Sequence, residues 1–571
     1  MGIHYNAYHE PLDYILKQGG SGLPRWPCGA SKAARPGCGS QRGAGAGRGS
    51  DAAQLEKSGL AAQRRLSCGV VSAMERDAIR IHPQDNVAVA LRPLAEGEAV
   101  SVDGQAVRIQ EEIPFGHKVA LTDLADGAMV VKYGAQIGHT TQAVPSGAWL
   151  HSHNLKTNLE GLLDYQYAPA APRQPEPGNG ADTFLGYCRP DGRVGTRNEL
   201  WIIPTVSCVN RTVSRMAEEA RRQGIQAGDG IFAFPHNAGC SQLGDDFETT
   251  QKLLRNLVKH PNAGGVLLVS LGCENNDLDH FLPVLGDYDR RRIRTLVTQD
   301  MEGDEIEAGL SLMREIAAVM AEDRREECPA SRLVLGFKCG GSDAFSGITA
   351  NPLCGRIAER VTDLGGTAVL TEVPEMFGAE TQLMNRADSV DTFQKIVHMI
   401  NSFKEYYIRY DQPIYENPSP GNKRGGITTL EEKSLGCIQK GGHAVVTDTL
   451  EMGQVCCKPG LNLMTGPGND SVSITNLLAS QAQVLLFTTG RGNPLGTAVP
   501  TIKIASNSAL FHRKPNWMDF NAGAVLERGS MDEPARELWQ LVLDVASGRV
   551  STRNEENNDR EIMLFKDGVI L

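Results

Sequence analysis

The sequence predicts a multidomain protein in which a small all-β module precedes two α/β units with mostly parallel, Rossmann-like sheets. The first reason is length: 571 residues are too many for one core, and 41% hydrophobic residues can fill several. The second is the short alternating apolar runs in residues 78–157, which turn residues separate. The third is that apolar runs from residue 200 onward end in polar loops that lead into helical patterns, as in parallel βαβ units.

Residues 1–73 differ in composition from the rest of the chain. They hold 13 of the 62 glycines and three of the 13 cysteines, and they carry a net charge of +5 against −16 for the remainder. The stretch 43–50 has neither periodicity nor apolar mass, and it cannot offset the entropy lost on ordering. The segment also has no apolar region of signal-peptide type. We therefore expect a disordered or non-native extension, with Met74 as the natural start.

The β module is expected to span residues 74–157. Its predicted strands are 79–81, 87–91, 99–102, 107–109, 118–121 and 129–131. Near its end, His151 and His153 lie two residues apart, so they point the same way if the segment is extended. Such a pair can bind one transition-metal ion when a third ligand joins it. Exposed histidines without a ligand are the alternative.

A Pro-, Ala- and Gly-rich linker is expected at 158–181, followed by the first α/β unit at 182–325. Its predicted strands are 200–206, 231–234, 265–271 and 292–298, and its predicted helices are 212–222, 245–259 and 304–321. Three of the four strands are followed by a cysteine, and these cysteines are Cys208, Cys240 and Cys273.

The second α/β unit is expected at 326–571. Its predicted strands are 333–337, 367–370, 444–447, 461–464, 484–487 and 501–504. Its predicted helices begin at 351 and cover 391–407, 430–439, 471–479 and 533–546. The carboxyl ends of parallel strands share one edge of a sheet, so we expect the polar, glycine-rich loops that follow these strands to converge there.

The loop at 338–343, KCGGSD, is the clearest candidate for ligand binding. An apolar strand precedes it and a helical pattern follows, and a glycine-rich turn in that position offers backbone N–H groups to an anion. An ordinary tight βα turn is the alternative. Dinucleotide and P-loop fingerprints are missing from the sequence, as is a nucleophile elbow, which argues against NAD, nucleoside triphosphates and triad hydrolysis.

Charged and amide side chains in these loops suit a small polyhydroxylated acid, because guanidinium groups bind carboxylates bidentately and amides read hydroxyls. The candidate cations are Arg193, Arg197, Lys338 and Arg491. The candidate hydroxyl-reading groups are Asn198, Ser342, Asn469 and Asn493. The carboxylates suited to acid–base chemistry or to a hard metal ion are Glu274, Asp343, Glu372 and Glu375. Surface salt bridges are the alternative for each charge taken alone.

Composition narrows the partners and the compartment. The net charge of −11 argues against nucleic acid and anionic lipid as main partners. No apolar run of about 18 residues exists, so no membrane span is expected. Many of the 13 cysteines stand beside glycine at the ends of apolar runs, which is typical of reduced thiols in a cytoplasmic protein. A homo-oligomer is left open.

From about Met74 to Leu571 the sequence resembles the altronate dehydratase/galactarate dehydratase family of sugar-acid hydro-lyases. The motifs that carry the resemblance are DNVAV at 85–89, FGHKV at 115–119, GRVGTRN at 192–198, LGCE at 271–274, CGGSDAFSG at 339–347, NPSPGN at 417–422 and FTTGRG at 487–492. The resemblance implies a SAF-type, β-clip fold for the β module. It also implies loss of water from an aldonic or aldaric acid with a divalent metal ion, iron(II) or manganese(II).

Within the family, the His-x-His segment at 151–154 and the run EVPEMFGAE at 372–380 resemble the altronate branch. The resemblance therefore implies conversion of D-altronate to 2-dehydro-3-deoxy-D-gluconate, a step of galacturonate breakdown. Dehydration of galactarate or another aldonic or aldaric acid is the alternative within the family. A non-catalytic sugar-acid binding protein is the alternative from another class.

The expected roles follow from that reaction. Groups for proton transfer and charge neutralisation are Lys338, Glu372 and Asp343. The base is expected to be a carboxylate such as Glu372, or Lys338 if neighbours lower its pKa, and the sequence leaves open which residue has which role. The substrate-binding set is Arg193, Arg197, Asn198, Ser342, Arg491 and Asn493. The metal ligands are expected to be His151, His153 and Glu274. A competing hypothesis is an iron–sulfur cluster held by three cysteines from the set Cys208, Cys240, Cys273 and Cys339; buried apolar cysteines without a cluster are the alternative.

Overall fold

The computed structural model describes residues 76–171, 173–175 and 182–569. The expectations for residues 1–73 and for part of the linker therefore lie outside the described residues.

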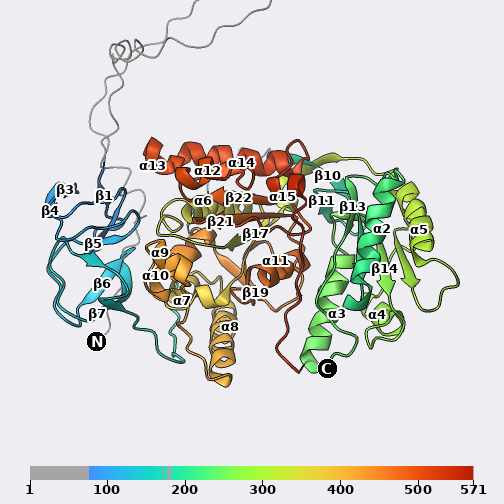
Figure 1. Cartoon of the computed structure of the whole chain (residues 1–571), viewed down its shortest axis with the longest axis horizontal. Helices are drawn as coiled ribbons and strands as arrows, with labels where there is room; N and C mark the ends of the chain where they lie inside the picture. The colour runs from blue at the N-terminus through green and yellow to red at the C-terminus, as the bar shows by residue number, and fades with distance from the viewer. Residues whose placement is uncertain (1–75, 172, 176–181, 570–571) are drawn as a thin grey trace, which may run out of the picture. The chain divides into compact units, whose positions relative to one another are not determined.

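The β module is built from antiparallel strands, as its alternating pattern predicts (Figure 1). One sheet has the order β1-β2-β5-β8, with bounds Ala78–Ile79, Val87–Ala90, Lys118–Ala120 and Trp149–Leu150. A hairpin joins β3 (Ala99–Val102) to β4 (Gln105–Arg108), and a further sheet has the order β6-β7-β9, with bounds Met129–Lys132, Ala135–Thr140 and Leu155–Lys156. The six predicted strands are present. The sequence reading missed β7, β8 and β9, because β8 and β9 have two residues each and β7 contains Gly138.

The first α/β sheet is parallel, with the order β13-β12-β14-β15 and bounds Gly230–Ala233, Glu199–Pro204, Ala263–Ser270 and Ile293–Val297. Alternate residues of β12 pack on opposite faces. Leu200 and Ile202 belong to the core under α2 (Asn210–Arg222) and α5 (Glu305–Met320). Trp201 and Ile203 belong to the core under α3 (Gly244–Val258) and α4 (Leu278–Leu285). Helices cover both faces, which is why the strands read as continuous apolar runs.

A small antiparallel sheet was not predicted. It has the order β11-β10-β16, with bounds Val194–Gly195, Thr183–Cys188 and Glu326–Pro329. The register pairs Phe184 with Cys328, so the segment that enters the first α/β unit lies beside the segment that leaves it. These strands are short and alternate between buried and exposed residues, which gives a weak sequence signal.

The second α/β sheet has seven strands, all parallel, in the order β19-β20-β18-β17-β21-β22-β23. Their bounds are Val446–Leu450, Gly460–Met464, Thr367–Leu370, Val334–Cys339, Val484–Thr489, Thr501–Ala505 and Phe520–Asn521. The helices predicted for this unit are α6 (Ala350–Asp363), α8 (Val390–Arg409), α10 (Leu430–Cys437), α11 (Asp470–Ala479) and α14 (Asp532–Ala546). The ends of the predicted α/β elements agree with these bounds within three residues.

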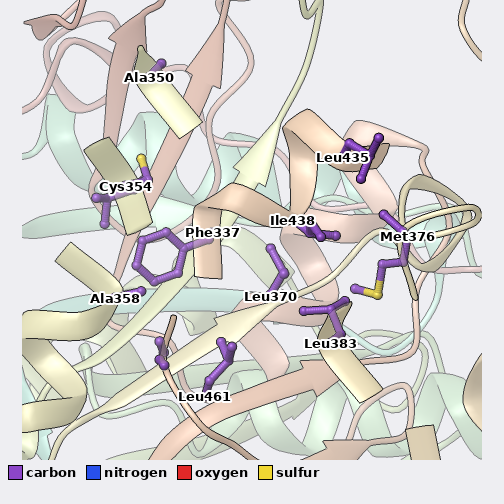
Figure 2. Close-up of a cluster of buried hydrophobic side chains, with 14 of the residues drawn as sticks. Phe337, Ala350, Cys354, Ala358, Leu370, Met376, Leu383, Leu435, Ile438 and Leu461 are labelled. Carbon is purple, nitrogen blue, oxygen red and sulfur yellow. The ribbon is translucent and has the colours of Figure 1, made fainter. Parts of the chain in front are cut away.

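One face of this sheet packs against α6 and α14, and the opposite face against α11 (Figure 1). Figure 2 shows Phe337, Leu370 and Leu461, from three neighbouring strands, facing Cys354 and Ala358 of α6. This packing holds β17 and β18 against α6, and it thereby positions the loops that follow these strands.

The two α/β sheets share a hydrophobic core. One cluster contains Trp201 and Ile203 of β12, Leu253 and Leu257 of α3, and Leu477 of α11. The face of the first sheet that α3 covers and the face of the second sheet that α11 covers are therefore buried in one core. Among the described residues, no helix is both long enough and apolar enough to cross a membrane.

Candidate active site

The carboxyl ends of β17 and β18 bring opposite charges together in the interior. Lys338, the penultimate residue of β17, is fully buried. Its Nζ donates to Glu372, lies 2.7 Å from Asp470 Oδ1 and donates to the carbonyl oxygen of Cys339 at 2.6 Å. Asp470 is the first residue of α11, and Glu372 follows β18. The expectation that strand-end loops converge at one edge is confirmed for these segments.

Glu372 is held in a costly backbone conformation. Its φ is 74° and its ψ is 57°, a left-handed geometry that costs a residue with a Cβ about 1–2 kcal/mol. Its carboxylate accepts hydrogen bonds from Lys338, from Lys440 Nζ at 3.0 Å and from the Cys339 N–H at 3.0 Å. Through these three donors Glu372 holds two lysines and the end of β17 in one arrangement.

The prediction that Lys338 could act as the base, if its neighbours lower its pKa, is corrected by the structure. Burial by itself lowers the pKa of Lys338, but Glu372 and Asp470 outweigh burial and raise that pKa above its usual value. The same balance, with burial lowering and neighbouring anions raising, leaves the pKa of Lys440 well above its ordinary value. Lys338 therefore stays protonated at neutral pH and is unsuited to act as a base.

Behind this network lies a triad of two thiols and a carboxylate. The Sγ atoms of Cys339 and Cys437 are 3.5 Å apart, and both contact Glu375 Oε2, at 3.0 and 3.1 Å. Glu375 Oε1 accepts from Lys433 Nζ at 2.7 Å. Burial raises the pKa of Glu375, but Lys433, Lys338 and Lys440 outweigh it and hold that pKa far below its usual value. Among the residues described here, the triad is the one group of three His, Cys, Asp or Glu donors within 4.8 Å of one another.

A small inner cavity adjoins this triad. Its polar walls include Ser342, Asp343, Lys433 and Cys437, and Tyr133 of the β module closes it on another side. Asp343 accepts from the Ser346 N–H at 2.9 Å, Ser506 Oγ at 2.8 Å and Asn507 Nδ2 at 3.0 Å, all uncharged donors. Burial accordingly raises its pKa. The Ser342 Oγ is buried and makes no hydrogen bond to the described residues.

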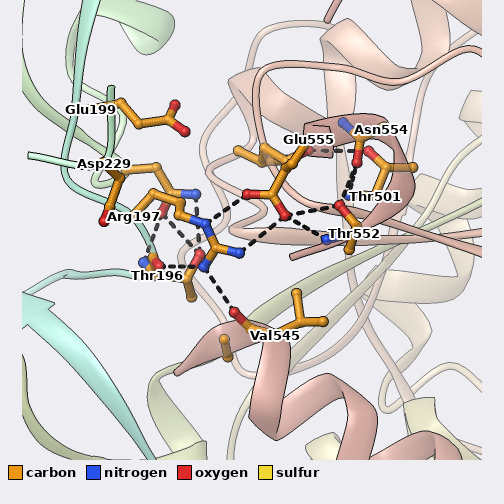
Figure 3. A network of polar contacts seen from close by, with 12 residues as sticks. Thr196, Arg197, Glu199, Asp229, Thr501, Val545, Thr552, Asn554 and Glu555 are labelled. Carbon is orange, nitrogen blue, oxygen red and sulfur yellow. Dashed lines mark hydrogen bonds and ion pairs between the residues drawn. The ribbon is translucent and has the colours of Figure 1, made fainter. Parts of the chain in front are cut away.

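The structure places three of the predicted substrate residues elsewhere. Arg193, Arg197 and Asn198 precede β12, at the amino end of the first α/β sheet. Figure 3 shows Arg197 directed at Glu555, with two contacts of 2.7 and 3.0 Å, and at the Val545 carbonyl oxygen at 2.8 Å. Asn198 accepts from Arg189 at 3.0 Å, and Arg193 pairs with Asp191. Ligands bind at the carboxyl edge of such sheets, so this placement favours a structural role for all three.

Two other predicted residues do approach the site. Arg491 and Asn493 follow β21, and the Arg491 N–H donates to the Gly341 carbonyl oxygen at 2.9 Å. Asn493 Nδ2 donates to Asp470 Oδ2 at 2.8 Å, on the carboxylate that pairs with Lys338. Their roles as substrate ligands stay predictions.

The predicted metal ligands are not brought together. His151 Nδ1 lies 3.1 Å from Thr428 Oγ1 and its ring stacks on Trp149, and His153 also packs against Trp149. Glu274 accepts from Ser270 Oγ at 2.7 Å and the Gly272 N–H at 2.8 Å, at the end of β14. The Glu274 carboxylate therefore stabilises the loop that follows β14 in the first α/β unit. The donor atoms that the structure does bring together are those of the triad, Cys339, Glu375 and Cys437.

The four cysteines of the iron–sulfur hypothesis are also divided. Cys208, Cys240 and Cys273 are exposed in loops at the carboxyl edge of the first α/β sheet. Cys339 is buried in the second sheet beside Cys437.

Sequence reasoning missed Lys433, Cys437 and Lys440. They lie in and just after α10, where all eight helical residues are buried and the apolar pattern is weak. The available signal was a run of charged residues in a helix bounded by glycines, which reads on its own as a solvated segment.

Lys503 adds a second lysine to this part of the sheet. The strand register places Lys338, Phe487 and Lys503 side by side on β17, β21 and β22. Lys503 is buried, its Nζ lies 3.3 Å from the Phe487 ring centroid, and it finds no hydrogen-bond partner among the described residues. Burial, only partly opposed by Asp470 and Asp519, lowers its pKa to about 7.

We expect Lys503→Met to be more stable than the parent protein at pH 7, with the advantage shrinking as pH rises. Between pH 7 and the unfolded-state pKa, the unfolded chain binds a proton that the folded chain lacks, so this lysine makes the parent more stable with rising pH. The difference in unfolding free energy should change by about 2 kcal/mol between pH 7 and pH 9. Chemical denaturation of both proteins at several pH values measures it.

The matched control is Lys404→Met. Lys404 is equally buried, but its Nζ lies 2.9 Å from Glu380 Oε1, so its removal leaves a buried carboxylate unpaired. That variant should lose about 3–5 kcal/mol. Parallel stability curves for the parent and Lys503→Met would contradict the assignment.

Three family models match most of the described chain. Residues 76–158 match the altronate/galactarate dehydratase SAF domain, residues 186–321 the D-galactarate dehydratase/altronate hydrolase second domain, and residues 330–570 the D-galactarate/altronate dehydratase C-terminal domain. The expected SAF-type module followed by α/β units is thereby confirmed.

Three curated proteins are similar over most of their length. Altronate dehydratase of Bacillus subtilis (strain 168) is 48% identical over 496 residues, which cover 86% of this chain and 99% of that protein. Altronate dehydratase of Escherichia coli (strain K12) is 49% identical with the same coverage. Galactarate dehydratase (L-threo-forming) of Escherichia coli (strain K12) is 34% identical over 498 residues, covering 84% of this chain and 94% of that protein.

Proposed function

Because this chain belongs to the altronate/galactarate dehydratase family, we propose that it is a hydro-lyase that converts D-altronate to 2-dehydro-3-deoxy-D-gluconate. Identities of 48% and 49% to altronate dehydratases, against 34% to a galactarate dehydratase, support altronate over galactarate. The structural observation that carries the proposal is the inner cavity, which Asp343, Lys433, the Ser342 hydroxyl and one residue of the thiol–carboxylate triad, Cys437, line together.

The reaction requires a proton to leave the carbon beside the substrate carboxylate, while the hydroxyl on the next carbon leaves with a proton as water. The resulting enol becomes the 2-keto product when that next carbon takes up a proton. Negative charge builds up on the carboxylate during proton removal, so the site needs a base at the carbon and a cation at the oxygens.

Asp343 is the residue best suited to carry the proton. It lines the cavity, only uncharged donors bind its carboxylate, and its raised pKa makes it a better base than an ordinary aspartate. Glu372, the other carboxylate considered, is bound by two lysines. Glu372 and Lys338 therefore position the end of β17 instead of touching substrate.

Lys433 supplies the cation at the cavity wall. Its Nζ is held by Glu375 at 2.7 Å and by Asn417 Oδ1 at 3.0 Å, and although burial opposes protonation, Glu375 and Cys437 raise its pKa above the usual value. The lysine is charged at neutral pH and can neutralise the substrate carboxylate. The unpartnered Ser342 hydroxyl beside it is suited to a substrate hydroxyl.

The triad fits the divalent metal ion that the family implies. Two thiols and one carboxylate form a mixed sulfur and oxygen donor set, which suits iron(II) better than manganese(II), an ion that prefers oxygen ligands. Three protein ligands also leave coordination positions open to substrate, as catalytic metal sites do. An ion held by Cys339, Glu375 and Cys437 would supply Lewis acidity to a substrate oxygen.

The test is an assay for 2-keto-3-deoxy acid with D-altronate and with galactarate, each with and without added iron(II) under anaerobic conditions. We expect product from D-altronate that depends on the metal. Product from galactarate alone would move the assignment within the family. No product from either acid, combined with saturable binding of altronate, would favour the non-catalytic binding protein.

A further inference from the structure

Tyr133 stands between two cavities although it belongs to the β module. It lines the inner cavity together with Ser342, Asp343 and Lys433. It also lines a second, larger cavity whose walls include Arg356 and His443. The other residue that borders both cavities is Gly347, which belongs to the second α/β unit. The phenol therefore reaches the proposed reaction site from a different structural unit.

The backbone at Tyr133 is strained. Tyr133 and Gly134 form the turn between β6 and β7, with φ values of 61° and 72°. Two positive φ values suit the primed turns of two-residue hairpins, whose first position normally carries Asn, Asp or Gly. A tyrosine there costs about 1–2 kcal/mol, and such strain is typical of functional positions.

Two side chains of the β module, Asp85 and Asn86, hold that turn by hydrogen bonds. The Gly134 N–H donates to Asp85 Oδ1 at 2.8 Å, and the Val131 N–H donates to Asn86 Oδ1 at 2.8 Å. Asp85 is 1% exposed, and its other carboxylate oxygen accepts from the His82 N–H at 2.9 Å, so the buried carboxylate joins this hairpin to the segment before β2. The DNVAV segment at 85–89 therefore acts on the site indirectly, by fixing the turn that carries Tyr133.

Two glycines make room for the phenol ring. A Cβ atom at Gly347 would lie 2.5 Å from Tyr133 Oη and 2.8 Å from Gly436 Cα. A Cβ atom at Gly436 would lie 3.6 Å from the same Oη. Gly347 lies in the loop before α6 and Gly436 lies in α10, so two elements of the second α/β unit lack side chains where the hydroxyl arrives.

A buried ion-pair triad fixes the β module against α10. Lys118 Nζ and Lys132 Nζ lie 2.8 and 2.7 Å from the two oxygens of Glu432, and all three side chains are at most 1% exposed. Buried pairs repay their desolvation only in a strict geometry, so they specify one docking arrangement. Glu432 precedes Lys433 in α10, and Lys132 precedes Tyr133. The ion pairs of Glu432 with Lys118 and Lys132 therefore fix the position of Tyr133 relative to Lys433.

Burial also raises the pKa of Tyr133 to about 12, so its hydroxyl is protonated at neutral pH and can donate. We propose that Tyr133 donates a hydrogen bond to a hydroxyl group of the sugar acid in the inner cavity, so that the β module completes the active site. This inference rests on the proposed function, because the ligand of the inner cavity is taken to be the sugar acid. The cavity has a volume of about 10 Å³ in this structure, room for one water molecule, so it must widen when the acid binds.

The first experiment compares Tyr133→Phe with the parent enzyme. Phe keeps the ring and removes only the hydroxyl, so kcat/KM for D-altronate should fall about 10- to 100-fold while the melting temperature and metal content stay unchanged. The matched control is Tyr167→Phe. Tyr167 also uses its hydroxyl, which donates to the Ala387 carbonyl oxygen at 2.7 Å, but it does not line the cavity, and its variant should keep parental kinetics.

The second experiment separates contact from a merely structural role. Parent and Tyr133→Phe are assayed with aldonic acids that each lack one hydroxyl beyond the reacting carbons. For the analogue that lacks the contacted hydroxyl, the two enzymes should have equal kcat/KM, and for the others the penalty should persist. An equal penalty on every analogue, or a loss accompanied by lower stability or metal content, would overturn the contact.

The outcomes distinguish this inference from the proposed function. A parent enzyme inactive on every sugar acid would refute the proposed function and remove the basis of the inference. An active parent whose Tyr133→Phe variant stays within twofold in kcat/KM would refute the inference alone.

Discussion

Replacing Asp343 with asparagine is expected to lower kcat for D-altronate by about 10²- to 10⁴-fold, the usual contribution of a positioned general base. The variant should fold, because asparagine has the same shape and its Oδ1 can still accept from Ser346 and Ser506; the hydrogen bond from Asn507 Nδ2 to the other oxygen is lost. The kcat/KM of the parent should fall at acidic pH as Asp343 takes up a proton, at a pKa that burial raises above its usual value. The variant should lack this limb of the profile.

The matched control is Asp519→Asn. Asp519 is another aspartate whose pKa burial raises, to about 6, and its carboxylate accepts from the Lys503 and Arg553 N–H groups. It does not line the inner cavity. Its variant should keep parental kcat. This result would show that a buried aspartate with a raised pKa matters for turnover only when it lines the inner cavity. An Asp343→Asn enzyme with kcat within threefold of the parent would exclude Asp343 as the base.

Replacing Cys437 with serine should abolish metal binding and reduce kcat at least about 100-fold. Substituting residues that only hydrogen-bond to metal ligands already costs about 10- to 100-fold in affinity or activity, and Cys437 is proposed to be a ligand itself. Serine keeps the size of the side chain but offers a hydroxyl, which is a poorer ligand for iron(II) than a thiolate. The measurements are metal content after anaerobic loading with iron(II) and turnover of the loaded protein.

Cys354→Ala serves as the control for this substitution. Cys354 is a buried free thiol of α6 that lies outside the triad, so its variant should load one equivalent of metal as the parent does. Acid-labile sulfide, assayed on the same samples, tests the iron–sulfur hypothesis. Sulfide that disappears in a Cys208, Cys240 and Cys273 triple serine variant, with iron unaffected by Cys437→Ser, would move the cofactor to the first α/β sheet.

The prediction of fold class succeeded where side-chain periodicity was strong. Alternating runs in residues 78–157 and buried runs such as β14 and β21 report directly on how many faces of a strand are covered. The antiparallel sheet β11-β10-β16 left no such signal, because its strands are short and its partners are separated by the entire first α/β unit.

Sequence reasoning anticipated which strand-end loops lie together and missed the residues that a helix contributes. Lys338 lies at the carboxyl end of β17, and Ser342, Asp343 and Glu372 follow strands of the same parallel sheet, so the topology of the sheet gathers them at one edge. Arg197 resembled them in chemistry, yet it precedes its strand, and the structure pairs it with Glu555. Residue type alone does not distinguish the two edges of a sheet.

The sequence by itself determined the β module, the two parallel sheets, the family and the glycine-rich loop at 338–343, because these depend on local periodicity and contiguous motifs. Only the tertiary structure decided that Cys437 meets Cys339 and Glu375, that Lys338 is locked as a cation, and that Tyr133 reaches the cavity. These contacts join residues far apart in the chain: Glu375 and Cys339 are 36 positions apart, Cys437 and Glu375 are 62 apart, and Lys132 and Glu432 are 300 apart. Such contacts are set by how helices and modules pack, which no local pattern encodes.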